Sequence, residues 1–424
     1  MKKIKVFVLA DNPLAPSGVA TQTRYMIEGL LKTGRYSFVC FGGAIKHQDY
    51  NPIRVDGYGD DWIIFPVDGY GNQEQVRSML QNHKPDIMWI MTDPRFWPWL
   101  WDIENEVRSV VPLVYYHVWD NYPYPNFNKQ YYMSNDMVAT ISKVTDDIVA
   151  NVAPGVKRTR IPHTTNTSIF KRVGTDEINN FRKNNNLAFK KNGEKKFIFF
   201  WNNRNARRKQ SGTLIWWFND FLEKVGKENA CLIMHTEPKD ENGQDLEAIM
   251  ENLNLVDGEV LLSTRKMPAE ELAFLYNVAD CTINISDAEG FGLGTLESLA
   301  CETPIIVNMT GGLQEQVVDE NENWFGVGIE PSSKAIIGSQ QVPYIYEDRI
   351  SKEDFIAALL KIYNMSEEER NKLGAMGRDH VLQNYGHDSY VELWDKTLTN
   401  LHEEVGSWSN RKHKSWELID LNEV

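Results

Sequence analysis

Residues 287–301 read Asp-Ala-Glu-Gly-Phe-Gly-Leu-Gly-Thr-Leu-Glu-Ser-Leu-Ala-Cys, and this stretch decides the fold that we expect. It places two glutamates, Glu289 and Glu297, eight positions apart with three glycines between them. The preceding residues, 279–286, alternate between apolar and polar side chains, which predicts a buried strand that ends near Ser286. A strand, a glycine-rich turn and a helix in this order are typical of a parallel α/β sheet, whose ligands bind beyond the carboxyl ends of its strands.

The turn and the predicted helix start favour a ligand that carries phosphate and hydroxyl groups. The three glycines have no Cβ, so backbone N–H groups can approach a ligand closely. We predict that Thr295 opens the helix, whose free N–H groups and positive dipole end favour a phosphate. Glu297 can then accept two hydrogen bonds from a vicinal diol such as a ribose, and Glu289 can do the same for a sugar ring. The alternative is that Glu297 only complements the helix dipole and the glycines only form a turn.

Length and composition indicate a two-domain globular protein. The chain has 424 residues, which is more than one ordinary core holds and suggests domains of about 200 residues each. The apolar run Val6–Ala10 stops at Asp11, which is too short for an export signal, so we predict a first buried strand there. No apolar stretch approaches the roughly 18 residues of a membrane-spanning helix. Any membrane contact would therefore be peripheral.

The cysteines and the net charge indicate which cellular compartment and which partners the protein has. Cys40, Cys231, Cys281 and Cys301 form no C-x-x-C pair, and we expect reduced core residues of a cytoplasmic protein. The net charge of −14 argues against nucleic acid as a partner. Residues 1–165, however, hold 17 Lys or Arg and 17 Asp or Glu, so this neutral half remains compatible with an anionic acceptor.

Strand-like and helix-like segments alternate along the chain, as in parallel sheets that are covered by helices. The predicted strands are 6–10, 37–41, 62–66, 87–91, 113–118 and 137–141 in the first half, and 196–201, 231–235, 260–262, 281–285 and 304–307 in the second. A helix is predicted over 17–32. The domain boundary falls near 161–171, and two such domains would face each other across a cleft.

Residues 202–210, Asn-Asn-Arg-Asn-Ala-Arg-Arg-Lys-Gln, follow a predicted strand and form the most basic cluster of the chain. Four cations on one loop need counter-charge, which a diphosphate would supply. A departing nucleoside diphosphate gains negative charge, so cations at that place stabilise the transition state more than the ground state. A solvated charged loop is the alternative.

The first half offers further candidates after its predicted strands. His117 ends the strand 113–118 and would face the cleft, although a buried structural histidine is the alternative. Asp120 could contact acceptor hydroxyls, and Tyr122 begins an aromatic run, 122–127, that suits stacking on a sugar or a base.

A second aromatic group, Trp97, Trp99 and Trp101, follows Asp93 and could form an acceptor wall. Core packing is the alternative for both aromatic groups.

Together these motifs resemble the GT4-type (group 1) retaining glycosyltransferases. Glu289 and Glu297 match the E-x7-E signature of that family, and Arg204 with Lys209 resembles its G-R-L-x-x-x-K segment. Asn203 and Asn205 replace the Gly and the Leu of that segment. Weaker similarities link 16–20 to its N-terminal glycine loop, 161–166 to its I-P-N-G-V-D segment, 310–315 to its G-G-x-x-E turn and 377–385 to its C-terminal helix.

The resemblance implies an α/β protein of GT-B architecture, with two Rossmann-like domains whose parallel sheets face across a cleft. Residues 1–165 would form the acceptor-side domain and 166–384 the nucleotide-sugar donor domain. Residues 385–424 would form a C-terminal helix that crosses back to the first domain, followed by a polar tail.

The resemblance also implies the site residues. The catalytic set would be His117, Arg204, Lys209 and Glu289. The donor-binding set would be Gly18, Gly290, Phe291, Gly292, Leu293, Gly294, Thr295 and Glu297, and Asp120 and Tyr122 could contact the acceptor. Domain closure would bring His117 and Gly18 against the donor.

The implied activity is sugar transfer from a nucleoside-diphosphate sugar to a hydroxyl acceptor such as a glycan, a lipid precursor or a small molecule. No metal or other cofactor is expected, because the sequence has no D-x-D motif and no His/Cys cluster at ligand spacing. Three alternatives remain: the same chemistry on hydroxylated nucleobases in DNA, a non-catalytic protein that binds nucleotide sugars, and a GT-B epimerase.

Overall fold

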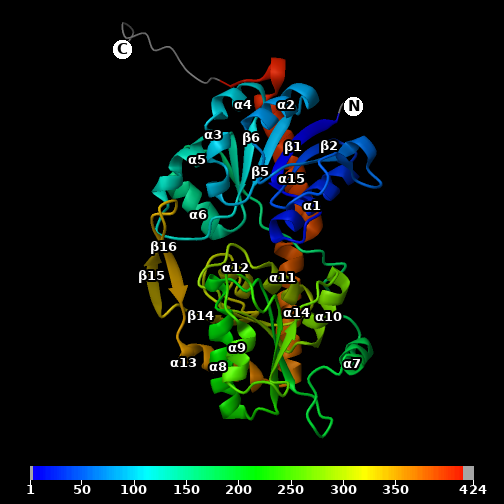
Figure 1. Cartoon of the computed structure of the whole chain (residues 1–424), viewed down its shortest axis with the longest axis vertical. Coiled ribbons are helices and arrows are strands. Elements are labelled where there is room, and N and C mark those ends of the chain that lie inside the picture. The colour runs from blue at the N-terminus through cyan, green and yellow to red at the C-terminus, as the bar shows by residue number, and fades with distance from the viewer. Residues whose placement is uncertain (1–2, 414–424) are drawn as a thin grey trace. The chain divides into compact units, whose positions relative to one another are not determined.

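The computed structural model describes residues 3–413, which divide into two compact units. The first unit comprises residues up to Trp119, residues 124–163 and residues from Asp388 onward, and the second comprises 120–123 and 164–387. Figure 1 shows each unit as a sheet with helices around it. The predicted divisions at 165 and 385 lie within a few residues of these limits, but residues 120–123 group with the second unit. The predicted polar tail lies partly outside the described residues.

The first unit is built on an eight-stranded sheet of order β3-β4-β2-β1-β5-β6-β7-β8. Its neighbouring strands are parallel except for the antiparallel pair of β3 and β4. The strands are β1 (Ile4–Asp11), β2 (Tyr36–Gly43), β3 (Ile53–Arg54), β4 (Trp62–Pro66), β5 (Ile87–Met91), β6 (Leu113–His117), β7 (Met137–Thr140) and β8 (Arg158–Arg160). The helices are α1 (Gly18–Lys32), α2 (Gln73–His83), α3 (Pro98–Trp101), α4 (Glu104–Val110), α5 (Lys129–Met133), α6 (Lys143–Val152) and α15 (His387–Val405). Sequence patterns missed β3 and β8, because these short edge strands bury few side chains.

The second unit has a six-stranded parallel sheet of order β11-β10-β9-β12-β13-β14 and a separate antiparallel hairpin of β15 and β16. The strands are β9 (Phe197–Asn202), β10 (Ala230–His235), β11 (Val260–Ser263), β12 (Cys281–Asn284), β13 (Ile305–Asn308), β14 (Gly326–Ile329), β15 (Ser333–Ile337) and β16 (Ile345–Arg349). The helices are α7 (Thr175–Asn184), α8 (Ser211–Val225), α9 (Leu246–Asn252), α10 (Ala269–Val278), α11 (Leu293–Ala300), α12 (Leu313–Val317), α13 (Lys352–Tyr363) and α14 (Glu367–Asn384). The predicted parallel α/β class is confirmed for both units, whereas the edge strand β14 and the hairpin were not predicted.

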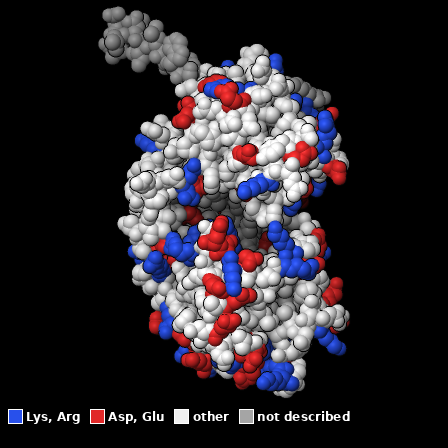
Figure 2. Space-filling view, viewed as in Figure 1, with Lys and Arg blue, Asp and Glu red and all other residues white. Residues whose placement is uncertain are grey.

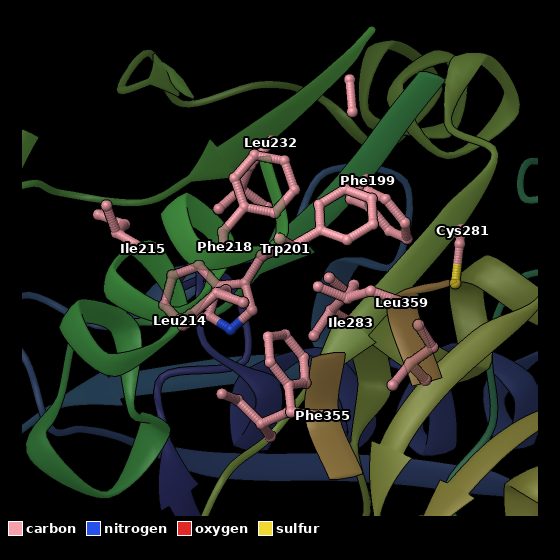
Figure 3. Close-up of a cluster of buried hydrophobic side chains, with 14 of the residues drawn as sticks. Phe199, Trp201, Leu214, Ile215, Phe218, Leu232, Cys281, Ile283, Phe355 and Leu359 are labelled. Atoms are coloured by element: carbon pink, nitrogen blue, oxygen red, sulfur yellow. The ribbon is translucent and has the colours of Figure 1, made fainter. Parts of the chain in front are cut away.

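The core of the second unit forms where α8 and α13 cover the sheet (Figure 3). Phe199 and Trp201 of β9 lie in this cluster with Phe218 of α8 and Phe355 of α13, and all four side chains are fully buried. Rings of this size account for much of the apolar area that a domain removes from water. The four cysteines are likewise buried and free.

Helix α15 belongs to the first unit although it follows the whole second unit in sequence. The Tyr390 hydroxyl donates to the Gln22 carbonyl oxygen at 3.0 Å, and the Tyr36 hydroxyl donates to the Asp395 carboxylate at 2.8 Å. Trp394 is fully buried against Trp89 of β5, with ring centroids 5.7 Å apart. The C-terminal helix therefore packs against α1, β2 and β5 of the first unit.

Charged side chains of both signs are mixed over the visible face, without a continuous basic area on that face (Figure 2). Within residues 3–413, no helix combines the length and the apolar character that a membrane span needs.

Candidate active site

The glycine-rich segment of the second unit lies between β12, which ends at Asn284, and α11, which begins at Leu293. The helix therefore starts two residues before the predicted Thr295. The helix begins directly after Gly292. The φ of this residue is +91°, a backbone conformation that favours glycine and that is incompatible with an α-helix. Gly294 then falls in the first turn, and a Cβ built there would lie 3.0 Å from the Asn202 carbonyl oxygen. The loop residues Gly290 and Phe291 and the helix residue Leu293 complete the segment.

The Thr295 side chain holds the helix start together. Its hydroxyl lies 2.8 Å from the Gly292 carbonyl oxygen and 2.7 Å from the Gln316 side-chain oxygen. The Gln316 amide in turn donates to the Phe291 carbonyl oxygen at 2.7 Å. Thr295 therefore serves the shape of the loop with its side chain, and Gln316 of α12 is a supporting residue that the sequence motifs did not identify.

Lys209 and Glu289 form a buried ion pair at the carboxyl end of the sheet. Their side chains are 8% and 12% exposed, and the Asn284 amide also donates to Glu289 at 3.3 Å. Burial lowers the pKa of Lys209 to about 8, aided by Arg208 and opposed by Glu289. Burial alone would raise the pKa of Glu289, but Lys209 and Arg208 outweigh it and keep that pKa below its usual value. The pair is charged at neutral pH and presents a cation beside the glycine loop.

Glu297 lies in α11 and accepts a hydrogen bond from the Tyr276 hydroxyl at 2.7 Å. The Asn202 amide donates to the same hydroxyl at 2.8 Å, so a chain of hydrogen bonds links β9, α10 and α11. Burial raises the pKa of Glu297 to about 7, and the Tyr276 hydrogen bond opposes this rise. The carboxylate is therefore held in one orientation and keeps lone pairs for a ligand.

The basic loop places its cations differently from the prediction. Arg204 is 61% exposed and forms a two-point ion pair with Asp240, at 2.6 and 3.0 Å. Arg208, which is not part of the predicted site, donates to the Ala288 carbonyl oxygen and contributes to the pKa shifts of Lys209 and Glu289. Arg208, and not Arg204, lies beside the Lys209–Glu289 pair.

Asn205 explains the position of Arg204. This buried amide donates to the carbonyl oxygens of Pro238 at 3.1 Å and Gln244 at 2.7 Å. It ties the loop to the segment that carries Asp240, and Arg204 is consequently drawn toward that carboxylate. A leucine, as in the family segment, could not form these hydrogen bonds.

Residues 120–123 bring two predicted acceptor contacts to the second unit. Burial raises the pKa of Asp120 to about 6, while Arg208 lowers it and Glu289 raises it. Asp120 is therefore close to the charged cluster. The Tyr122 carbonyl oxygen accepts from the Tyr346 N–H at 2.5 Å, and the Asn121 amide donates to the Tyr346 carbonyl oxygen at 2.9 Å. These two hydrogen bonds to the Tyr346 backbone, one of them from the Asn121 side chain, hold the segment along β16.

His117 and Gly18 lie in the first unit. The His117 ring is fully buried, with Nε2 2.8 Å from the Tyr132 hydroxyl, and burial lowers its pKa to about 3. The imidazole is therefore neutral at physiological pH, and its buried Nδ1 has no hydrogen-bond partner among the described residues. Gly18 is the exposed first residue of α1, directly after the cap Ser17.

Gly311 illustrates how tightly the loops around Glu289 pack. Its φ is +49°, and a Cβ built on it would lie 1.8 Å from the Glu289 carbonyl oxygen. We expect Gly311→Ala to lower the free energy of unfolding by about 3 kcal/mol, because backbone must move. The control is Gly57→Ala, since Gly57 has a φ of +85° and nothing within 4 Å of its Cβ. That change should cost only about 1 kcal/mol of backbone strain. Equal losses in chemical denaturation would contradict the packing argument.

The raised pKa of Glu297 makes donor binding pH-dependent. The folded value of about 7 exceeds the ordinary 4.5, so ionisation of Glu297 makes folding less favourable as pH rises between these values. A bound diol should favour the ionised form. We therefore expect the donor Kd to fall by about 5-fold between pH 6 and 7.5, a range in which Lys209 stays largely protonated. A Glu297→Gln variant should lose this dependence in calorimetric titrations, and an unchanged slope would contradict the assignment.

Residues 182–358 match the family model described as "Glycosyl transferases group 1". This segment therefore belongs to the group 1 glycosyltransferases. The chain is 34% identical over 90 residues to a D-inositol 3-phosphate glycosyltransferase of Acidothermus cellulolyticus, which covers 21% of the chain and 20% of that relative. The chain thus aligns with about a fifth of the length of such relatives.

Solved structures extend the likeness to the whole fold. Sucrose-phosphate synthase from Thermosynechococcus elongatus matches with a TM-score of 0.74 and 16% identity, over 95% of this chain and 100% of that one. Anabaena Alr3699/HepE in complex with UDP and glucose matches with a TM-score of 0.67 and 13% identity, over 94% and 99%. These neighbours are GT-B glycosyltransferases. The predicted fold class, two α/β domains with parallel sheets, is therefore confirmed.

Proposed function

We propose that this protein is a retaining glycosyltransferase that moves a sugar from a nucleoside-diphosphate sugar to a hydroxyl acceptor. The observation that carries the proposal is the buried Lys209–Glu289 pair beside the glycine loop and the start of α11. A cation, a loop with close backbone approach and a diol-binding carboxylate are the groups that a nucleotide sugar requires. The group 1 match over residues 182–358 supports the same conclusion.

Each of the site residues in the second unit has a role in this proposal. Glu297 accepts the ribose hydroxyls, and the Gly290–Thr295 segment approaches the sugar and the phosphates with its backbone. Lys209 and Arg208 neutralise the charge that develops on the leaving diphosphate. Glu289, held by Lys209, positions the sugar hydroxyls and does not form a covalent bond.

The proposed reaction keeps the configuration at the anomeric carbon. The acceptor oxygen attacks the face from which the diphosphate leaves, the bond to the phosphate oxygen breaks, and that oxygen takes the acceptor proton. We propose that no metal or cofactor is needed, because Lys209 and Arg208 supply positive charge at the diphosphate. The neutral, buried His117 would act by hydrogen bonding at most, since a pKa of about 3 leaves it unprotonated near pH 7.

Two finer expectations belong to the same proposal. UDP-glucose is the first donor to test, because neighbouring structures hold UDP with glucose or a fluorinated UDP-glucose. We also propose a cytoplasmic location, in agreement with four buried free cysteines.

The two arginines of the basic loop should differ in their effect on catalysis. We expect Arg208→Ala to lower kcat by about 30-fold, because it removes positive charge beside the diphosphate. Arg204→Ala removes an exposed pair with Asp240 and should change kcat by less than about 3-fold. Steady-state kinetics of both variants give the comparison. A larger loss in Arg204→Ala would return the phosphate role to that residue.

The proposed function is tested by following nucleoside diphosphate release from a panel of nucleotide sugars, with and without EDTA. One donor should be hydrolysed slowly in the absence of acceptor, EDTA should not prevent this, and Glu297→Ala should strongly slow it at donor concentrations that half-saturate the wild type. NMR of the first product should show the anomeric configuration of the donor. Absence of release from every donor while donor binding persists would favour a binding protein, and conversion of the sugar without release would favour an epimerase.

A further inference from the structure

Thr92 of the first unit has an unusual backbone conformation. It follows β5 directly and has a φ of +118°, which β-branched residues rarely adopt. The residue is buried, and its carbonyl oxygen accepts a hydrogen bond from the Tyr115 hydroxyl at 2.8 Å. Such strain persists only where the surrounding structure enforces it, and it is concentrated at functional sites.

Thr92 lies where the strand order of the sheet reverses. Strand β1 pairs with β2 on one side and with β5 on the other, and the chain continues outward in both directions. Open α/β sheets bind ligands beyond the carboxyl ends of the two strands at this switch point. Asp11 ends β1, and Thr92 and Asp93 follow β5. The two strand ends therefore bring two carboxylates to the expected ligand position.

Tyr70 connects the two strand ends. Its hydroxyl donates to the Asp11 carboxylate at 2.9 Å and also contacts the Thr92 side chain. The Ser17 hydroxyl donates to the other Asp11 oxygen at 2.5 Å. Among the described residues, both partners of the Asp11 side chain are thus hydroxyl groups, so its negative charge is not neutralised by a cation.

Asp93 is oriented by the neighbouring Arg95. The guanidinium donates to both Asp93 oxygens at 2.9 Å, and the Asp93 side chain remains 24% exposed. Because Arg95 is used in this pair, it adds no free positive charge. The carboxylate keeps lone pairs that can accept from a ligand.

Aromatic rings lie next to these carboxylates. The Tyr70 ring packs against Phe96 and Trp97, with centroids 4.9 and 5.1 Å apart, and Phe96 is 44% exposed. Trp97 and Trp101 are buried, so of the predicted acceptor wall only Trp99 is partly accessible. The exposed part of this wall is formed by Phe96, Trp99 and the half-buried Tyr70.

We infer that these switch-point strand ends bind the acceptor, and that the acceptor is a polyhydroxylated molecule without a phosphate group. The inference rests on the proposed transferase function. Asp11 and Asp93 can accept hydrogen bonds from hydroxyl groups, and the negative charge of Asp11, which has only hydroxyl partners among the described residues, disfavours a phosphate. The aromatic wall suits the apolar C–H face of a sugar or cyclitol ring.

The test compares matched acceptors in the full-length enzyme with its donor. The pairs are myo-inositol with inositol 3-phosphate, glucose with glucose 6-phosphate, and fructose with fructose 6-phosphate. At least one neutral member should accelerate nucleoside diphosphate release, with a kcat/KM at least 10-fold above that of its phosphorylated partner. Asp11→Asn should raise the KM for that acceptor by about 10-fold, whereas Asp102→Asn, an exposed site in the same unit, should not.

Each result decides the inference separately from the proposed function. Preference for the phosphorylated members, or donor hydrolysis that no neutral acceptor accelerates, would overturn the inference and leave the transferase assignment intact. An unchanged KM in Asp11→Asn and in a second variant, Asp93→Asn, would also overturn it, provided that both unfold at the wild-type temperature. Absence of release from any donor would instead remove the proposed function.

Discussion

Replacing Lys209 with methionine is expected to lower kcat for sugar transfer by about 10²–10³-fold. The Lys209 ammonium is the buried cation of the site, and the leaving diphosphate gains its extra charge in the transition state. The loss should appear mainly in kcat, because the ground-state donor interacts with the same cation less strongly. Stopped assays of nucleoside diphosphate release, at saturating donor, measure this change.

A matched control tests whether the loss of kcat requires the lysine to lie in the site. Lys266 is an exposed lysine of the same unit, and Lys266→Met should leave kcat within about 2-fold of the wild type. Lys209→Met also leaves Glu289 without its ion-pair partner, so the double variant Lys209→Met/Glu289→Gln tests whether the loss comes from an unpaired carboxylate. Recovery of kcat in the double variant would contradict a direct role for Lys209.

Replacing Glu297 with alanine is expected to raise the donor Kd by about 10²-fold. The carboxylate can accept two hydrogen bonds from a ribose diol, and each charge-assisted bond contributes about 1.5–3 kcal/mol. Because the ribose is held equally before and during the reaction, the effect should fall on KM much more than on kcat. Titration calorimetry with the donor and steady-state kinetics provide the two readouts.

Tyr276 supplies the graded comparison for Glu297. Tyr276→Phe keeps the ring and removes the hydroxyl that orients the carboxylate, so we expect about a 10-fold rise in donor Kd. The control is Phe218→Leu in the hydrophobic core, on α8. This change should lower the free energy of unfolding without a change in donor Kd. If Glu297→Ala instead lowered kcat and left KM and the donor Kd unchanged, this glutamate would act at the reacting sugar and not at the ribose.

The sequence was sufficient for the fold class because apolar periodicity is local. Each strand of the predicted set buries side chains along its own length, as β5 and β10 do, and such runs can be identified without a partner. The hairpin of β15 and β16 escaped prediction for the same reason. β15 is largely exposed, and its structure depends on cross-strand pairing with β16.

The basic loop shows why a sequence motif could not predict which arginine lies beside the Lys209–Glu289 pair. Spacing alone paired Arg204 with Lys209, but the buried amide of Asn205 ties its loop to the segment of Asp240. Arg208 then takes the place beside the ion pair. The partner residues lie more than 30 positions away, so no local pattern contains this information.

By itself, the sequence determined the two α/β units, the carboxyl-end location of the glycine segment and the residue types around it, because strand periodicity and turn chemistry act over short stretches. Only the tertiary structure decided the pairing of Lys209 with Glu289, the support of Glu297 by Tyr276, and the meeting of Asp11 with Tyr70. Long-range packing brings these groups together, and their burial sets which of them remain charged and which hydrogen bonds they can still form.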